Sequence, residues 1–247
     1  MAVVTFTLFA FDTLPGRLWA FSQMGLAKPA LRRTPGLAFF KLMGTGSGDG
    51  FSTWPNFGIY TLLCEWPSLE VAQDAVEDAP IFGRYRSHAS RMATLFLDPL
   101  TARGSWAGHE FACPQLAARQ AMPVIAMTRA SIRPSKLFRF WPRVPGISDA
   151  VLDEPTRHFM IGTGEAPWLN QVTFSVWNDL EAMRDFSLKS PSHGEAVRRA
   201  YSENWFSEYC FVRFNLLGQD GEWPGLDLPG IRNSRSAPAP GLQEETT

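Results

Sequence analysis

The segment FFKLMGTG, residues 39–46, reveals how this chain is organised, because its closing Gly-Thr-Gly triplet returns at residues 162–164. Strand-forming residues precede both copies. Four further matches keep the same order: residues 18–21 with 137–140, 66–70 with 177–181, 80–83 with 191–194, and 104–106 with 221–223. The offsets differ by only a few residues, so short loop insertions or deletions explain them. The sequence therefore predicts a two-fold internal duplication.

Hydrophobic periodicity predicts the same β-α-β-β-α-β order in each half, which is the ferredoxin-like order of an α+β fold. Expected strands cover residues 3–11, 37–43, 57–66 and 94–97, then 123–132, 157–161, 171–177 and 209–217. Expected helices cover residues 17–27, 68–77 and 82–92, then 136–151, 179–188 and 191–204. Two such sheets protect their exposed edges by closing into one barrel. The predicted division is a first repeat at 1–106, a linker at 107–122, a second repeat at 123–228, and a disordered tail at 229–247.

Composition excludes several classes of protein. The net charge of -1 gives no field for nucleic acid or anionic lipid, and no run of 18 apolar residues exists to span a membrane. Three widely spaced cysteines favour neither a disulfide framework nor a thiolate metal site, and they fit a reducing cytoplasm. The apolar amino terminus lacks the basic region of a signal peptide. With 13% aromatic and only 19% charged residues, the chain has either a very aromatic core or an apolar ligand pocket.

The familiar catalytic motifs are missing. The glycine-rich run at residues 44–50 is followed by a predicted strand rather than a helix, so a hairpin turn with positive φ is favoured over a phosphate-binding loop. No His-Glu-x-x-His motif indicates a zinc hydrolase, and no Gly-x-Ser-x-Gly motif indicates a serine hydrolase.

His193 is the most informative histidine, because helical spacing places it on one stripe with Val197 and Tyr201. A histidine on such a stripe is either a hydrogen-bonded core residue or a ligand. The duplication aligns it with Phe82, and a difference between repeats at this position is what a cofactor bound once per chain would produce. Both interpretations stay open. His158 is the second candidate ligand, whereas His88 and His109 are expected to be solvated.

Several cysteines, aromatic residues and arginines can be interpreted either as structural residues or as parts of a binding site. Cys64 and Cys210 are expected to be small core residues. Aromatic residues near the first helix and the hairpin turn of each repeat either pack in the core or line an entrance for a long apolar substrate: Trp19, Phe21, Phe140, Trp141 and Trp168. Arg139, Arg143 and Arg198 are either surface residues or partners of an acidic group.

Five long strings resemble the spheroidene monooxygenases, a family of bacterial carotenoid ketolases. They are LWAFSQMGLA (18–27), FFKLMGTGSGDGF (39–51), FRFWPRVPGIS (138–148), IGTGEAPWLNQVTFSVW (161–177) and SHGEAVRRAYSENWF (192–206). The resemblance extends from about residue 3 to residue 228.

This resemblance implies a haem-dependent oxygenase that introduces a 2-oxo group into acyclic carotenoids such as spheroidene, by two hydroxylations and loss of water. It implies haem b, molecular oxygen and reduced ferredoxin, and a dimeric α+β barrel-type fold like that of chlorite dismutase. His193 then matches the haem ligand, with Val197 and Tyr201 beside the cofactor. Arg139 and Arg198 are the candidate catalytic residues. A membrane-borne substrate implies peripheral contact with the membrane, and a homo-oligomer is compatible with this fold.

The sequence leaves three alternative functions open. They are a cofactor-independent monooxygenase on the same fold, a non-catalytic carrier of haem or a lipophile, and a barrel with no ligand in which His193 is a core residue.

Overall fold

The computed structural model describes residues 1–47, 54–113, 123–141, 154–166, 168–189, 198 and 202–226. Within them, eight antiparallel strands close into a barrel in the order β1-β3-β2-β6-β7-β5-β8-β4. The strands are β1 (Val3–Ala10), β2 (Phe39–Gly46), β3 (Pro55–Trp66), β4 (Arg91–Gly104), β5 (Val124–Ile132), β6 (Arg157–Gly164), β7 (Asn170–Trp177) and β8 (Phe206–Asp220). The prediction of an α+β barrel is confirmed at this level.

The two halves of the barrel have the same strand order, β4-β1-β3-β2 and β8-β5-β7-β6. They join along two seams. At the long seam, β4 pairs with β8 from Thr94–Asp220 to Gly104–Cys210. At the short seam, β2 pairs with β6 only through Gly44–Gly164 and Thr45–Thr163, which we call the β2–β6 seam. Equivalent triplets from the two halves therefore face each other.

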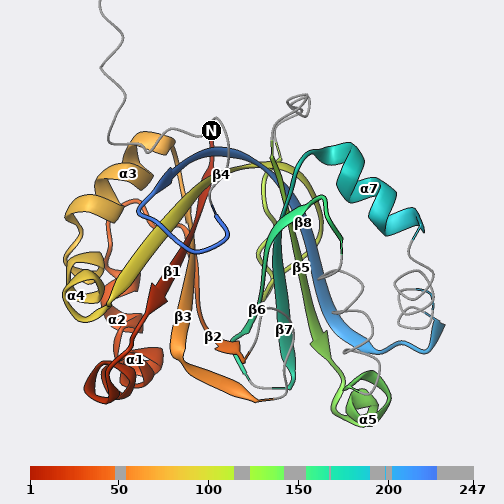
Figure 1. Cartoon of the computed structure of the whole chain (residues 1–247), viewed down its shortest axis with the longest axis horizontal. Coiled ribbons are helices and arrows are strands. Elements are labelled where there is room, and N and C mark those ends of the chain that lie inside the picture. Colours follow the sequence, from red (N-terminus) through yellow and green to blue (C-terminus); the bar gives the residue numbers. More distant parts are fainter. Residues whose placement is uncertain are drawn as a thin grey trace, which may run out of the picture.

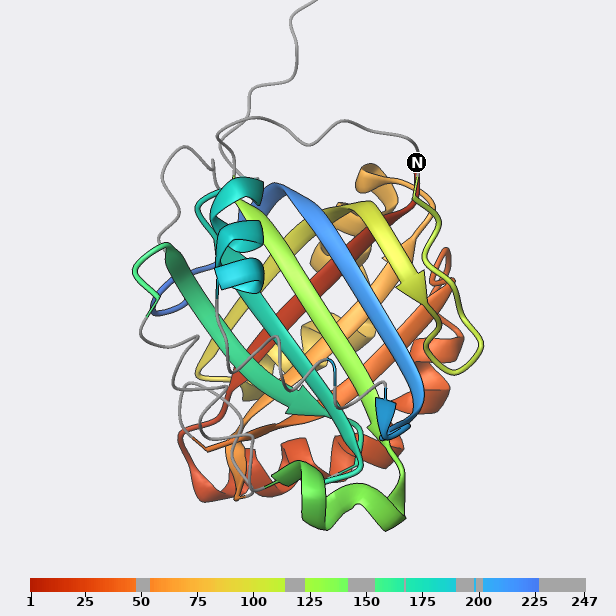
Figure 2. The same ribbon diagram turned by 90° about the vertical axis from the view of Figure 1, so that its right-hand side faces the viewer.

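Helices lie outside the barrel, as Figure 1 shows. In the first half these are α1 (Leu14–Leu26), α2 (Lys28–Arg32), α3 (Leu69–Asp78) and α4 (Pro80–His88). In the second half the described helices are η1 (Pro134–Lys136), α5 (Leu137–Phe140) and α7 (Leu180–Lys189), with α7 and α5 at opposite ends of the strands (Figure 2). Side-chain oxygens cap three helices: Thr13 begins α1, Ser68 begins α3 and Asp179 begins α7.

Strand alternation divides the core into an inner and an outer layer. Inward-facing apolar side chains from both halves fill the barrel, and the rings of Phe6 and Phe174 stack across it at 3.9 Å between centroids. The outward-facing residues of the first half pack beneath its four helices. Trp106 and Trp223, from the repeated Gly-x-Trp motif, both belong to the inner layer. The barrel is thus a packed core and not an open channel.

The repeated glycines before these tryptophans have one geometry. Gly104 and Gly221 have φ of 83° and 77°. A Cβ at Gly104 would lie 2.2 Å from the carbonyl oxygen of Tyr209, and one at Gly221 would lie 2.2 Å from that of Met92. Both positions require glycine, because a side chain would overlap a neighbouring strand.

Several details differ from the sequence-based expectations. The Gly-Thr-Gly triplets lie within β2 and β6, and none of their glycines has positive φ, so the expected turn was wrong for the triplets. Pairing across the β2–β6 seam keeps them extended. Residues 48–50 of the glycine-rich run lie outside the described residues. Strand β4 is longer than expected and crosses Pro99 with shifts of register. Residues 107–113 of the expected linker fold back, and Phe111 is buried in the inner layer. Residues 114–122 and the tail from 227 lie outside the described residues.

Candidate ligand face of the second half

Strand register aligns the outer faces of the two halves position by position. Val3 pairs with Trp66 as Val124 pairs with Trp177. Thr5 pairs with Phe96 as Ala126 pairs with Arg213. Each outward side chain of the first sheet therefore has a counterpart in the second.

Large apolar residues on the first outer face become small or polar on the second. Phe9, Leu62 and Phe96 are almost fully buried under α1 to α4. Their counterparts, in the same order, are Ala130, Thr173 and Arg213. Thr173 and Arg213 are half-buried, and Thr128 is exposed where Thr7 is fully buried. The change is not uniform, because Phe211 is the counterpart of Thr94. We call this surface of β5, β7 and β8 the ligand face, because at the three positions above it has less apolar side-chain volume than the first half.

Arg213 is the charged residue of this face. Burial lowers the pKa of its guanidinium, and the nearby positive charge of Arg184 lowers it further. Among the described residues it makes no ion pair with a carboxylate. Two arginines held close together without such a carboxylate favour binding of an acidic group.

The predicted site residues are only partly described. His193, Val197 and Tyr201 lie outside the described residues. Arg139 lies on α5, and its Nη1 is 3.0 Å from Oε2 of Glu203 with half of its side chain exposed. Arg198 is exposed. His158 is the second residue of β6, lies at a register shift and is exposed, so its side chain does not turn into the barrel.

The other two histidines differ from each other. His88 is exposed, as expected, and its ring stacks on Trp19. His109 was expected to be solvated, and this was wrong: its Nε2 lies 2.7 Å from Oε2 of the buried Glu65, and its ring stacks on Phe39. Burial raises the pKa of Glu65, and the positive charge of His109 acts in the opposite direction. Sequence periodicity missed this contact because His109 lies in a segment without regular structure.

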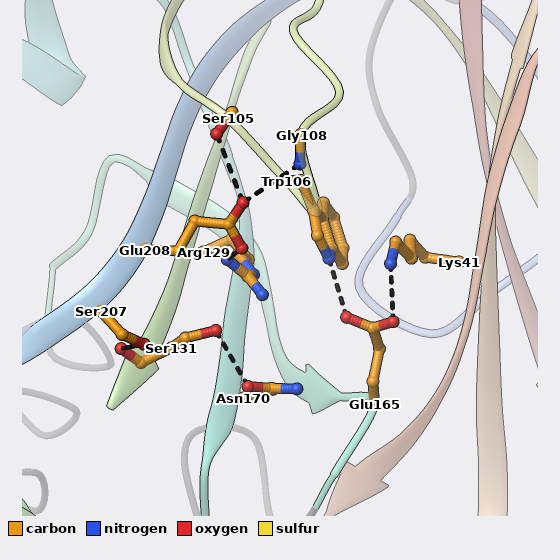
Figure 3. Close-up of polar contacts among 10 residues, drawn as sticks. All are labelled: Lys41, Ser105, Trp106, Gly108, Arg129, Ser131, Glu165, Asn170, Ser207 and Glu208. Atoms are coloured by element: carbon orange, nitrogen blue, oxygen red, sulfur yellow. Dashed lines mark hydrogen bonds and ion pairs between the residues drawn. The ribbon is translucent and has the colours of Figure 1, made fainter. Parts of the chain in front are cut away.

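A polar cluster lies beside Trp106 (Figure 3). Glu165 accepts hydrogen bonds of 2.8 Å from both Lys41 Nζ and Trp106 Nε1. Glu208 accepts from Arg129, from the Ser105 hydroxyl and from the Gly108 amide. Burial alone would raise the pKa of Glu208, but these bonds outweigh it and lower the pKa. Every charge in this cluster is paired, which indicates a structural role in closing the barrel.

The expectations for Cys64 and Cys210 are confirmed, since both are fully buried in the core and burial raises the pKa of each thiol. Among the described residues no group of three or more His, Cys, Asp and Glu side chains could hold a metal ion. No helix in the described part of the chain is long and apolar enough to cross a membrane.

Two crystal structures of aldoxime dehydratase resemble the fold. One, in complex with butyraldoxime, has a TM-score of 0.59 at 10% identity and covers 87% of this chain and 79% of that chain. The other has a TM-score of 0.58 at 8% identity and covers 87% of this chain and 81% of that chain. At these identities the likeness concerns the fold alone.

No family model matches the sequence. Curated relatives do match nearly all of it. The spheroidene monooxygenase of Rhodobacter capsulatus is 40% identical over 229 residues, covering 92% of this chain and 95% of the relative. The enzyme of the same name from Cereibacter sphaeroides is 38% identical over 231 residues, covering 93% and 71%. That from Rubrivivax gelatinosus is 35% identical over 223 residues, covering 88% and 84%. The chain belongs to the spheroidene monooxygenase family.

Proposed function

We propose that this chain is a haem-dependent monooxygenase that introduces a 2-oxo group into an acyclic carotenoid such as spheroidene. Membership of the family supports a carotenoid monooxygenase. The proposed reaction hydroxylates one methylene carbon twice and loses water from the resulting gem-diol. Each hydroxylation consumes one O2 and two electrons, which reduced ferredoxin would supply, and releases one water molecule.

The proposed haem b site is the ligand face, with His193 as the iron ligand and Val197 and Tyr201 beside it. The observation that carries this placement is the contrast between the two outer faces. In the first half, Phe82 is fully buried and packs near Trp66. In the second half, His193 aligns with that ring in the sequence. The facing sheet has the smaller or polar Ala130, Thr173 and Arg213 in place of large apolar residues, although Phe211 stands where the first half has Thr94. The smaller side chains of Ala130 and Thr173 reduce the volume over this part of the sheet, which suits a flat group. When bound there, haem would supply the centre at which O2 is reduced.

The described residues fit the sheet side of such a site. Arg213 offers a cation for the acidic groups of haem. Around the proposed centre, the protein's part is to orient the carotenoid and exclude water. Arg139 and Arg198 stay proposed as catalytic residues, although the pairing of Arg139 with Glu203 gives it a structural role as well.

The proposed architecture is two ferredoxin-like repeats, residues 1–106 and 123–228, fused into a chlorite dismutase-like barrel. The equal strand order, the matching registers and the paired roles of Gly104 and Gly221 support it. Independent folds rarely share all three features.

Peripheral contact with the membrane belongs to the same proposal, because the substrate is lipid-soluble. Helix α1 supports it by exposing Leu14, Leu18 and Phe21 along one side. The net charge of the whole chain is -1, but residues 13–36 contain four basic and no acidic side chains, and this local positive charge suits a surface of anionic lipid. We place the chain on the cytoplasmic side, since its three cysteines are unpaired. Association into homo-oligomers is compatible with this arrangement.

A turnover assay tests the proposed reaction. Purified protein supplied with haem, spheroidene, O2 and reduced ferredoxin should yield a product with one more oxygen and two fewer hydrogens. Rapid sampling should also detect a mono-hydroxylated species that is consumed later. Turnover of equal rate without haem would instead support the cofactor-independent rival, and haem binding without turnover would support a carrier.

A further inference from the structure

A cavity of about 260 Å³ lies where the two halves meet at the β2–β6 seam. Its walls come from α1, from β2 and the start of β3, and from the residues that connect β6 to β7. The lining residues described are Phe21, Met24, Gly44, Thr45, Gly46, Pro55, Asn56, Phe57, Tyr60, Gly162, Thr163, Gly164, Glu165, Ala166, Trp168, Asn170 and Gln171. No histidine is among the described residues that line it.

Glycines give the cavity a floor of bare backbone. The triplets of both halves contribute Gly44, Gly46, Gly162 and Gly164 to the lining. A Cβ at Gly164 would lie 2.0 Å from the carbonyl oxygen of Asn170, so this position requires glycine. A Cβ at Gly44 would meet no atom within 4 Å. Packing therefore does not demand glycine at Gly44, and its missing side chain keeps the cavity open.

Exposed aromatic rings form the mouth. Phe21, Phe57 and Trp168 each line the cavity with more than half of the side chain exposed. The rings of Phe21 and Phe57 are in edge-to-face contact at 6.0 Å. Trp168 has φ of 63°, a backbone conformation that is costly for a bulky residue. Backbone strain of this kind is often found at ligand sites, where it holds a side chain such as Trp168 in the orientation that binding requires.

Among the polar side chains of the lining, Tyr60 and Glu165 differ in their hydrogen bonding. Tyr60 is 3% exposed, and its hydroxyl has no hydrogen-bond partner among the described residues. Burial raises the pKa of this phenol, which keeps it protonated as a donor. The carboxylate of Glu165 is already engaged by Lys41 and Trp106. Of these two groups, Tyr60 is the one left to bind a ligand oxygen, because a buried hydroxyl without a partner costs free energy. The hydroxyl is closed off from solvent in the ligand-free structure, so binding requires the Tyr60 side chain to turn toward the cavity.

We propose that this cavity binds one end of a long, uncharged polyene that carries a single oxygen, and that the rest of the molecule leaves between the aromatic rings. The volume is below the about 300–1,000 Å³ of sites that enclose a whole ligand. Gly162 and Gln171 belong to the lining and also to the outward side of β6 and β7, so the cavity adjoins the ligand face. The identification with a carotenoid end rests on the proposed function.

Titration with all-trans-retinol, a fluorescent polyene with one hydroxyl, tests the inference on the full chain without an electron donor. Gly44→Val should weaken retinol binding at least tenfold, because the new side chain fills the cavity. Gly218→Val is the matched control, since Gly218 lies on β8 with no atom within 4 Å of its Cβ and does not line the cavity. The control should bind within about twofold of the unaltered protein, and both variants should keep the circular dichroism spectrum and melting temperature.

Unchanged binding by Gly44→Val, or an equal loss in the Gly218→Val control, overturns the inference. Should Gly44→Val prove unstable, Phe57→Ala at the exposed mouth takes its place, and it should weaken retinol binding at least threefold. These measurements do not depend on oxidation. If retinol binding behaves as expected while the turnover assay yields no oxidised carotenoid, the proposed function fails and the binding site stands.

Discussion

At the scale of single residues, the pKa of Glu208 is set more by its hydrogen bonds than by its burial. Its pKa is lowered, so the folded state binds this proton less readily than the unfolded state does. The stabilisation is therefore present above about pH 4.5, the ordinary value, and is lost as pH falls through the folded pKa. We predict that Glu208→Gln costs about 1–3 kcal/mol of unfolding free energy at pH 7, as expected for a charge-assisted bond to the buried Arg129.

Between pH 6 and pH 3, Glu208→Gln should lose less unfolding free energy than the unaltered protein does. Urea denaturation at each pH measures this difference. Equal losses of unfolding free energy in both proteins would mean that protonation of Glu208 does not contribute to the pH dependence of stability. Glu165→Gln is a useful comparison, since that carboxylate is also paired inside the cluster.

For Tyr60 we predict an effect on stability opposite to that of Glu208→Gln. Removing an unpartnered buried hydroxyl should leave the unfolding free energy of the ligand-free protein unchanged or raise it by about 1 kcal/mol. Tyr60→Phe should at the same time weaken retinol binding by about three- to tenfold, which is the usual worth of one neutral hydrogen bond. Thermal denaturation and the retinol titration measure the two effects. A clear loss of stability would show that the hydroxyl already has a partner in the protein.

Sequence reasoning identified some of these residues and missed others for physical reasons. His193 could be singled out because its counterpart Phe82 is apolar. Arg213 was missed, because its meaning appears only when strand register places it opposite Phe96. His109 looked solvated because no periodicity links it to Glu65, which is distant in sequence.

At the scale of elements, α1 reverses the usual pattern of a surface helix. It buries Gly16, Ala20 and Gln23 against the barrel and exposes its large apolar residues. Apolar periodicity predicted a helix here and placed its start later than Leu14. The small buried residues let the helix lie close to the sheet. The exposed residues need another apolar partner, which the proposal identifies as lipid.

This gives a prediction for the helix. The triple variant Leu14→Gln, Leu18→Gln and Phe21→Gln should reduce sedimentation with anionic phospholipid vesicles at least tenfold, because it removes the apolar side that would enter the interface. Leu26→Gln, at an exposed position on another side of α1, is the control and should bind nearly as before. Vesicle binding that survives the triple variant would show that α1 is not the contact.

At the scale of the whole molecule, the strands were largely predictable and the asymmetry of the halves was not. Alternating apolar residues located all eight described strands to within a few residues at most ends, because half-buried strands impose that pattern. Ends near Pro99 and in the triplets were misjudged, since pairing between halves decides them. Which outer face carries large apolar side chains at the three positions that define the ligand face depends on strand register, and the sequence alone does not give that register.

The asymmetry is also the basis of the functional account. One half is closed by Phe9, Leu62 and Phe96, and the other presents Ala130, Thr173 and Arg213. The proposed duplication, with a cofactor on the ligand face alone, gives one cofactor per chain. That cofactor is proposed to be haem, bound by the residue that takes the place of Phe82.

The absorption spectrum of haem-supplied protein tests this central claim most directly. The unaltered chain should show a Soret band from bound haem, and His193→Ala should lose the band or shift it. His158→Ala should leave it unchanged, since His158 is exposed at the start of β6. An unaltered spectrum in His193→Ala, or a band that depends on His158 instead, would contradict the account.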